Sequence, residues 1–256
     1  ARWLFTRTYW DMTNDGGLQD QAVTGLFRDG VNAIGSVNYA VGSGLVMSKA
    51  AALMSRFIAA GGSREFDLSD PVRFPAVQAG TFFPLESLVA GGFQPRIGDG
   101  GRAIDGRLNA TMVNYADAIR FAWRTSGDAR MAWLLKHVVK RSTESDAQWA
   151  AVEQAAAGGR DPLLAAGSRN LEGFGLAILE SGSEQDDFSK KRALTFRHGV
   201  GKGHAHADSL GLEYYAHGVR VVPDAGSRGG APHPGDMRAH LGVTVDEAGM
   251  RNSGEI

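Results

Sequence analysis

Hydrophobic residues recur at every third or fourth position through much of the first 165 residues, which is the period of an amphipathic α-helix. The spacing is clearest at 45–58, 112–122 and 132–139. Glycine pairs interrupt it, and Asp128 stands where its side chain can cap the helix that follows. This part of the chain therefore predicts helical hairpins joined by glycine-rich loops.

Beyond residue 165 the pattern changes to short apolar or alternating runs separated by turn residues, which is typical of antiparallel strands. The runs lie at 174–179, 193–197, 210–215, 219–222 and 243–245. His217 and Gly218 stand between two of them and predict a hairpin turn. Because helices come first and strands second, we expect an α+β fold and not an alternating parallel sheet. We predict a helical portion at 1–166 and an antiparallel β portion at 167–256.

Composition excludes several classes of protein. The chain has 256 residues, 43% of them hydrophobic, which is enough for a full core. A net charge of −1 with both signs interspersed argues against a nucleic-acid-binding or membrane-surface protein. The lack of cysteine excludes disulfides and thiolate metal sites and leaves the compartment open. Because the chain begins at Ala1 without methionine and stops shortly after a strand-like run, we expect a piece of a longer protein.

Residues that can carry chemistry concentrate in the last quarter of the chain, which holds six of the seven histidines. His204, His206 and Asp208 alternate with alanines, so in an extended segment they lie on one face, which the alanines leave accessible. Two imidazoles and a carboxylate suit a metal site or proton transfer. Asp224 ends the next pair of strands and can return to the same place. A lone histidine is more often a surface loop residue, but this cluster favours a functional site.

Spacing argues against three familiar types of site. Metallo-β-lactamase-type hydrolases have His-x-His-x-Asp-His, whereas Ser209 stands at the last of these positions. The His-x-His of amidohydrolases opens a barrel, and too little chain follows residue 206 to build one. The glycine-rich run at 98–101 lacks the lysine and hydroxyl residue of a phosphate loop and does not follow a predicted strand. Nucleotide binding is therefore not expected.

The run from 171 to 246 resembles the C-terminal β domain of the heparinase II/III-like polysaccharide lyases. The likeness is carried by Gly-Phe-Gly-Leu-Ala-Ile-Leu-Glu-Ser-Gly at 173–182, by the histidine-rich run at 204–218 and by Pro-Asp-Ala-Gly-Ser at 223–227. Their order and spacing match over a stretch much longer than a single short motif. The resemblance implies an α+β multidomain fold, in which a partial (α/α) helical toroid is followed by an antiparallel β-sandwich.

Relatives of this family that bind zinc imply a metal site here. The corresponding ligands are His206, Asp224 and a later histidine, which is His240, with His233 as the alternative. Leu241 stands where the family has asparagine after this histidine. The zinc in those relatives is mainly structural and fixes the loop that presents the preceding histidine, here His204. The resemblance implies a structural Zn²⁺ and no organic cofactor, with Asp208 ordering the loop.

The helical half carries a second part of the resemblance. Gly-Leu-Gln at 17–19, Asp-Gly at 29–30 and Asn-Tyr at 38–39 resemble the lyase pattern Gly-Ile-Gln, His-Gly and Tyr-Gly. The tyrosine of that pattern is the catalytic acid and base, which assigns the role to Tyr39. Asp29 replaces the histidine of the pattern, so the match is incomplete.

Gly-Arg-Ala-Ile at 101–104 resembles a family run whose arginine binds substrate, which assigns that role to Arg102. The family also has an asparagine that neutralises the substrate carboxylate, some tens of residues before the tyrosine. No room exists for it before Tyr39. Either the chain lacks the first helices of the toroid or the assignment of the tyrosine is wrong.

The resemblance implies β-elimination on an acidic, uronate-containing polysaccharide, such as alginate or a heparan-like polymer. Tyr39 would act as the acid and as a candidate base, His204 would assist proton transfer or neutralise the substrate carboxylate, and Arg102 would hold the substrate carboxylate or sulfate. For such an enzyme we expect a periplasmic or secreted location. Two alternatives stay open: a zinc-dependent hydrolase, and a carbohydrate-binding protein that keeps the fold without the chemistry.

Overall fold

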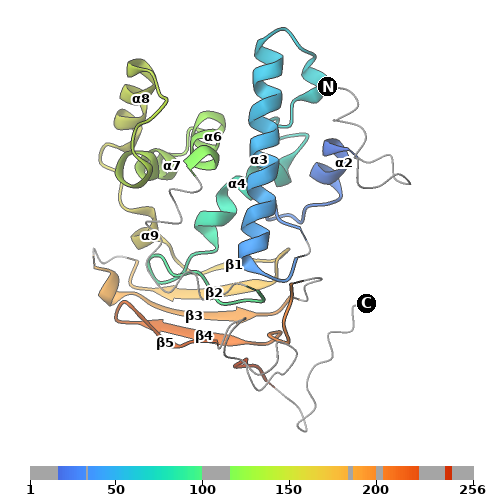
Figure 1. Cartoon of the computed structure of the whole chain (residues 1–256). Helices are drawn as coiled ribbons and strands as arrows, with labels where there is room; N and C mark the ends of the chain where they lie inside the picture. The colour runs from blue at the N-terminus through green and yellow to red at the C-terminus, as the bar shows by residue number, and fades with distance from the viewer. Residues whose placement is uncertain are drawn as a thin grey trace.

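A computed structural model shows a group of helices followed by an antiparallel sheet (Figure 1). It describes residues 17–32, 34–99, 116–183, 187–199, 204–224 and 240–243. The order of helices first and strands second confirms the α+β class that the hydrophobic pattern predicts. None of the described helices combines the length and the hydrophobicity that spanning a bilayer requires.

In the helical part, the predicted segments 45–58 and 132–139 are helical, and so is the described portion of 112–122. Its described elements are α2 (Leu18–Val23), α3 (Val37–Ala59), η1 (Arg64–Phe66), α4 (Pro75–Glu86), α6 (Ala116–Ser126), α7 (Ala129–Leu134), the π-helix η3 (Leu135–Val139), α8 (Asp146–Ala156) and α9 (Pro162–Ala165). Asp128 caps α7 as predicted, because its carboxylate accepts a hydrogen bond of 2.8 Å from the backbone N–H of Arg130.

The described strands form one antiparallel sheet in the order β1-β2-β3-β4-β5. Their bounds are β1 (Arg169–Leu171), β2 (Leu176–Ser181), β3 (Arg192–Arg197), β4 (Leu212–Ala216) and β5 (Val219–Val222), with the short 3-10 helix η4 (Phe188–Lys190) before β3. Four of them were predicted, and β1 was not. His217 and Gly218 both have positive φ, 55° and 71°, which confirms the tight turn between β4 and β5.

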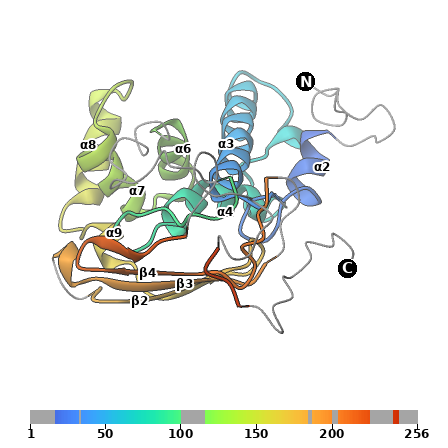
Figure 2. The ribbon, with the colours of Figure 1, turned by 60° about the horizontal axis from the view of Figure 1, so that its bottom comes forward.

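The helices cover one face of the sheet, as both views show (Figures 1 and 2). Leu176 and Ile178 of β2 are fully buried in a core that also contains Val41 of α3 and Phe83 of α4, whereas Leu179 points outward and is 58% exposed. Each buried side chain of this kind contributes roughly 1.5–3 kcal/mol. The helical and β parts thus share a hydrophobic core across residue 166, where the chain passes from helices to strands.

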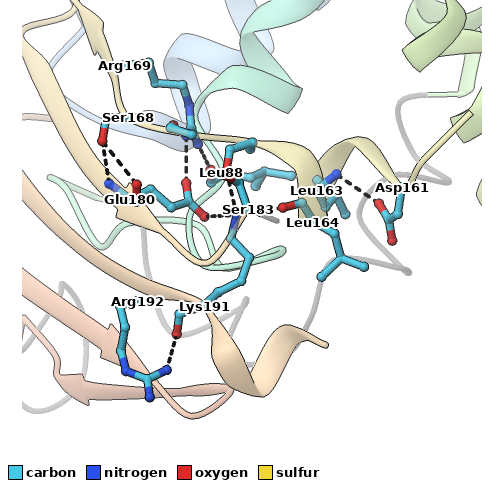
Figure 3. Close-up of polar contacts among 12 residues, drawn as sticks. Leu88, Asp161, Leu163, Leu164, Ser168, Arg169, Glu180, Ser183, Lys191 and Arg192 are labelled. Atoms are coloured by element: carbon cyan, nitrogen blue, oxygen red, sulfur yellow. Dashed lines mark hydrogen bonds and ion pairs between the residues drawn. The ribbon is translucent and has the colours of Figure 1, made fainter. Parts of the chain in front are cut away.

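A buried ionic cluster also joins the two parts (Figure 3). Glu180 of β2 lies 3.0 Å from Lys191 Nζ and 2.7 Å from the guanidinium of Arg169. The ammonium of Lys191 donates hydrogen bonds to the carbonyls of Leu164 and Ala166, at the end of α9. The side chains of Glu180 and Lys191 are completely buried. We call Glu180, Lys191 and Arg169 the junction cluster.

The guanidinium of Arg169 extends the junction cluster to the end of α4. Its Nε donates a hydrogen bond of 2.7 Å to the carbonyl of Glu86, and Nη2 donates to the carbonyl of Leu88. The segment that follows, from Leu88 to Ile97, is buried between the helices and the sheet, with Val89 and Phe93 in the shared core. This segment leads directly to the loop at Gly98 and Asp99.

Candidate functional site

The rings of Tyr39 and His204 stack where the helical part meets the β part. Tyr39 lies in the first turn of α3, and His204 lies in the loop that leads to β4. Their ring centroids are 3.8 Å apart and their planes differ by 16°. Tyr39 is 41% exposed, and the side chain of His204 is 42% exposed. The tyrosine is therefore not a core residue, and both predicted catalytic rings are accessible to solvent.

One carboxylate, that of Asp99, contacts His204 and His206 of the predicted site. Asp99 Oδ2 lies 2.6 Å from Nδ1 of His204, and Oδ1 lies 2.9 Å from Nε2 of His206. The hydrogen bond with His204 is the main cause that lowers the pKa of Asp99, so the group is a carboxylate near neutral pH. Because a carboxylate only accepts hydrogen bonds, both contacting imidazole nitrogens carry hydrogens.

The backbone holds this arrangement tightly. The N–H of Asp99 donates a 2.9 Å hydrogen bond to the carbonyl of His204. Gly98 has φ +59°, and a Cβ there would lie 2.3 Å from the carbonyl oxygen of Gly35 and 2.4 Å from that of His204. Only glycine fits between these two segments. His204 itself has φ +49°, a left-handed conformation that is strained for a residue with a side chain.

The prediction that His204, His206 and Asp208 share one accessible face is wrong. The run is not a strand, because the left-handed backbone at His204 turns the chain, and His206 and Asp208 are only 3% and 4% exposed. Asp208 Oδ2 accepts a 2.5 Å hydrogen bond from the N–H of Gly98. Burial raises the pKa of Asp208 above its usual value, and the Gly98 hydrogen bond opposes this.

The three predicted zinc ligands, His206, Asp224 and His240, lie together and are buried. The rings of His206 and His240 have centroids 5.2 Å apart, and Nδ1 of His240 lies 3.0 Å from both oxygens of Asp224. Two imidazoles and a carboxylate suit zinc chemically. In the geometry observed, however, Nε2 of His206 faces Asp99, and no three described side chains are arranged to hold a metal ion. We therefore derive no chemical step through a metal.

A buried carboxylate in β4, that of Glu213, fixes the neighbouring segments. It accepts hydrogen bonds from the N–H of Arg96 at 2.9 Å, from the N–H of Asp224 at 3.1 Å and from the hydroxyl of Tyr215 at 2.7 Å. Burial raises the pKa of Glu213, and the nearby Arg220 opposes this. Glu213 thus links the segment that carries Asp99 to the residue predicted as a zinc ligand.

Other residues named from the sequence have different outcomes. Arg102 and His233 lie outside the described residues. Asp29, which replaces the histidine of the lyase pattern, accepts a 2.7 Å hydrogen bond from the N–H of Phe174 and so ties the helical part to the turn before β2. Asp99 was missed as a site residue, because the glycine-rich run around it was considered only as a phosphate loop.

A separate groove of about 780 Å³ lies between α3 and α6. Its lining includes Lys49 and Arg56 of α3 and Arg124 of α6, but none of the predicted site residues. The contacts among Tyr39, His204 and Asp99, and not the groove, define the candidate site.

Solved structures of three polysaccharide lyases have a similar fold. A heparinase III, the BT4657 gene product with methylated lysines, gives a TM-score of 0.60 at 13% identity, over 91% of this chain and 32% of its own. A mutant of the heparan sulfate lyase HepC from Pedobacter heparinus gives 0.59 at 15% identity, over 91% of this chain and 33% of its own. A further heparinase III gives 0.56 at 12% identity, over 91% of this chain and 34% of its own.

These likenesses show the fold alone, because the identities are low. The chain spans about a third of the length of the proteins that it resembles. No protein-family model and no curated protein matches its sequence. The predicted relation to heparinase II/III-like lyases is therefore confirmed at the level of the fold, as a helical part followed by an antiparallel β part.

Proposed function

We propose that this chain is part of a polysaccharide lyase that cleaves an acidic, uronate-containing polysaccharide by β-elimination. The observation that carries the proposal is the stack of Tyr39 on His204, which joins an ionisable ring from α3 to one from the β part. Both rings are accessible, and the His204 ring is held by Asp99. The similar fold of heparinase III and of a heparan sulfate lyase supports this assignment.

The reaction needs a base, an acid and a group that stabilises negative charge. The base removes the proton on C5, next to the carboxylate of the uronate. The C4–C5 double bond forms as the bond from C4 to the bridging oxygen breaks, and the acid gives that oxygen a proton. We assign Tyr39 as the acid and as a candidate base, with His204 as its partner. Arg102 is proposed to neutralise the substrate carboxylate.

We also propose a structural Zn²⁺ on His206, Asp224 and His240, because the resemblance implies it. The side chains are not arranged around a common point in the structure, so binding would require the ring of His206 to turn away from Asp99. The proposed task of the zinc is to fix the loop that carries His204, with no part in the reaction itself. Metal analysis of the purified protein tests this point. We expect roughly one zinc per chain, lost in His240→Ala. An equal zinc content in the variant would contradict the proposed ligand set.

The absorbance of an unsaturated product tests the lyase proposal directly. The full chain is incubated with heparan sulfate, alginate and other uronate polymers, and the ultraviolet absorbance of the new double bond is followed. We expect activity on at least one polymer, and a loss of about 100-fold or more in Tyr39→Phe and in His204→Ala.

Two matched variants control for nonspecific effects. Tyr214 is an exposed tyrosine on β4, and His198 is an exposed histidine that contacts Asn170. Tyr214→Phe and His198→Ala should retain full activity. If no polymer gives an unsaturated product while Tyr39→Phe and His204→Ala bind the polymers normally, the lyase proposal fails and a carbohydrate-binding role remains.

A further inference from the structure

The carboxylate of Asp99 contacts the His204 ring of the Tyr39–His204 stack directly. The resemblance to the lyases assigns Asp99 no role. Its Oδ2 lies 2.6 Å from Nδ1 of His204, a short charge-assisted distance. Its other oxygen contacts His206, so one carboxylate accepts from two imidazole rings. A side chain with two acceptor oxygens is needed to satisfy both rings in this way.

The position of Asp99 is fixed independently of its side chain. Its N–H donates to the carbonyl of His204, so the same residue holds both the backbone and the ring of the histidine. Ile97, two residues earlier, is buried in the core shared by the helices and the sheet. Gly98 packs against Gly35, two residues before α3 begins. The carboxylate is therefore presented from a rigid part of the molecule.

We propose that Asp99 is a positioning residue that fixes the orientation and the tautomer of His204 for proton transfer. Because Asp99 accepts a hydrogen bond from Nδ1, Nε2 is the ring nitrogen left for proton transfer. The stack on Tyr39 and the Asp99 hydrogen bond together leave the ring little freedom to rotate. The catalytic part of this inference rests on the proposed lyase function, and the structural part does not.

The strained backbone at His204 supports this assignment. A left-handed conformation at a residue with a side chain persists only where its surroundings enforce it, and such residues cluster at functional sites. Here the enforcing contacts come from Asp99 and Gly98. A histidine that merely filled a surface loop would not need a carboxylate held against its ring.

The tautomer of His204 is measured by nitrogen NMR on the full chain with ¹⁵N-labelled histidine, and its signals are assigned with His204→Gln. We expect the Nδ1–H form in the unmodified protein. In Asp99→Ala, which keeps the backbone hydrogen bond, we expect a change to the Nε2–H form that predominates in free histidine. An Nε2–H form in the unmodified protein, or no change in the folded variant, overturns the inference.

Kinetics then test the catalytic part. In Asp99→Ala we expect kcat to fall about 100-fold or more, with KM changed less than about threefold, because the proposed task of Asp99 is to hold His204 and not to bind substrate. Asp117→Ala, which removes an exposed carboxylate on α6, is the matched control and should keep its kcat. An unchanged kcat in Asp99→Ala overturns the catalytic part.

The two measurements separate this inference from the proposed function. If the tautomer changes as expected and no polymer is cleaved by the unmodified protein, the lyase proposal fails while the positioning of His204 by Asp99 stands. If polymers are cleaved and Asp99→Ala leaves both the tautomer and kcat unchanged, the lyase proposal stands and the inference fails.

Discussion

Two charged clusters connect the helical part to the sheet, and they differ in what surrounds their charges. In the junction cluster, Glu180 and Lys191 are completely buried and contact each other, the guanidinium of Arg169 and backbone carbonyls. In the candidate site, Asp99 holds His204, but the histidine ring is 42% exposed and stacks on a tyrosine that is also exposed. The charges of Glu180 and Lys191 have no accessible surface to offer a ligand, whereas the ring of His204 does.

The contrast separates charges that hold the fold from charges that can do chemistry. A buried ion pair with hydrogen-bonded partners contributes to the fold because either charge, left buried without its partner, would be strongly destabilising. An accessible histidine held by a carboxylate on one nitrogen keeps the other nitrogen available. The left-handed backbone at His204 adds to this difference, since the junction residues Glu180 and Lys191 have no such strain.

Removal of the central carboxylate of the junction cluster is the strongest test of this contrast. In Glu180→Ala the buried ammonium of Lys191 and the guanidinium of Arg169 lose their opposite charge. We expect the free energy of unfolding to fall by roughly 3–5 kcal/mol, measured by urea denaturation. Glu172→Ala is the control, because its ion pair with Arg28 is exposed and should contribute less than about 1 kcal/mol. Equal effects of the two variants would contradict the structural role of the cluster.

A second buried ion pair, Arg120 with Glu144, tests how the stability of the protein depends on pH. Burial raises the pKa of Glu144, but hydrogen bonds from the Ser142 N–H and from Arg120 outweigh it and lower the pKa from 4.5 to about 2. The stabilisation is therefore fully present above pH 4.5 and is lost as the pH falls toward 2. The shift corresponds to roughly 3 kcal/mol.

Urea denaturation of the unmodified protein and of Glu144→Gln, from neutral pH down to pH 2, measures this effect. The variant should be less stable at neutral pH, and the difference should shrink as the pH falls below 4.5. A difference that is constant across this range would show that the pKa of Glu144 is not lowered by folding.

Periodicity predicted most of the fold because its signals are local. The apolar spacing at 45–58 and 132–139 corresponds to α3 and to α7 with η3, and four of the five described strands were found from alternation. β1 was missed because three residues are too short for a pattern to appear. The shared core was also missed, because it depends on how α3 and α4 pack on β2 and not on any one segment.

The candidate site was predictable only in part. The histidine run was visible as a motif, and Tyr39 was named from its place in a pattern. The contact between Asp99 and His204 joins residues 105 positions apart, so no local spacing reveals it. The burial of His206 and Asp208 was hidden for the same reason, because alternation with alanine suggests an exposed face wherever the chain is assumed to be extended.

The smallest expected change in stability comes from a comparison of His217 and His204, which share the same strained backbone conformation. His217, in the turn between β4 and β5, has φ 55°, and His204 has φ 49°. Asparagine tolerates this conformation better than histidine, so His217→Asn should raise the free energy of unfolding by roughly 0.5 kcal/mol and leave lyase activity unchanged. His204→Asn relieves the same strain but removes the ring that stacks on Tyr39 and contacts Asp99, so activity should be lost. Loss of activity in both variants would contradict the view that the contacts of His204 with Tyr39 and Asp99, and not its backbone conformation, set it apart.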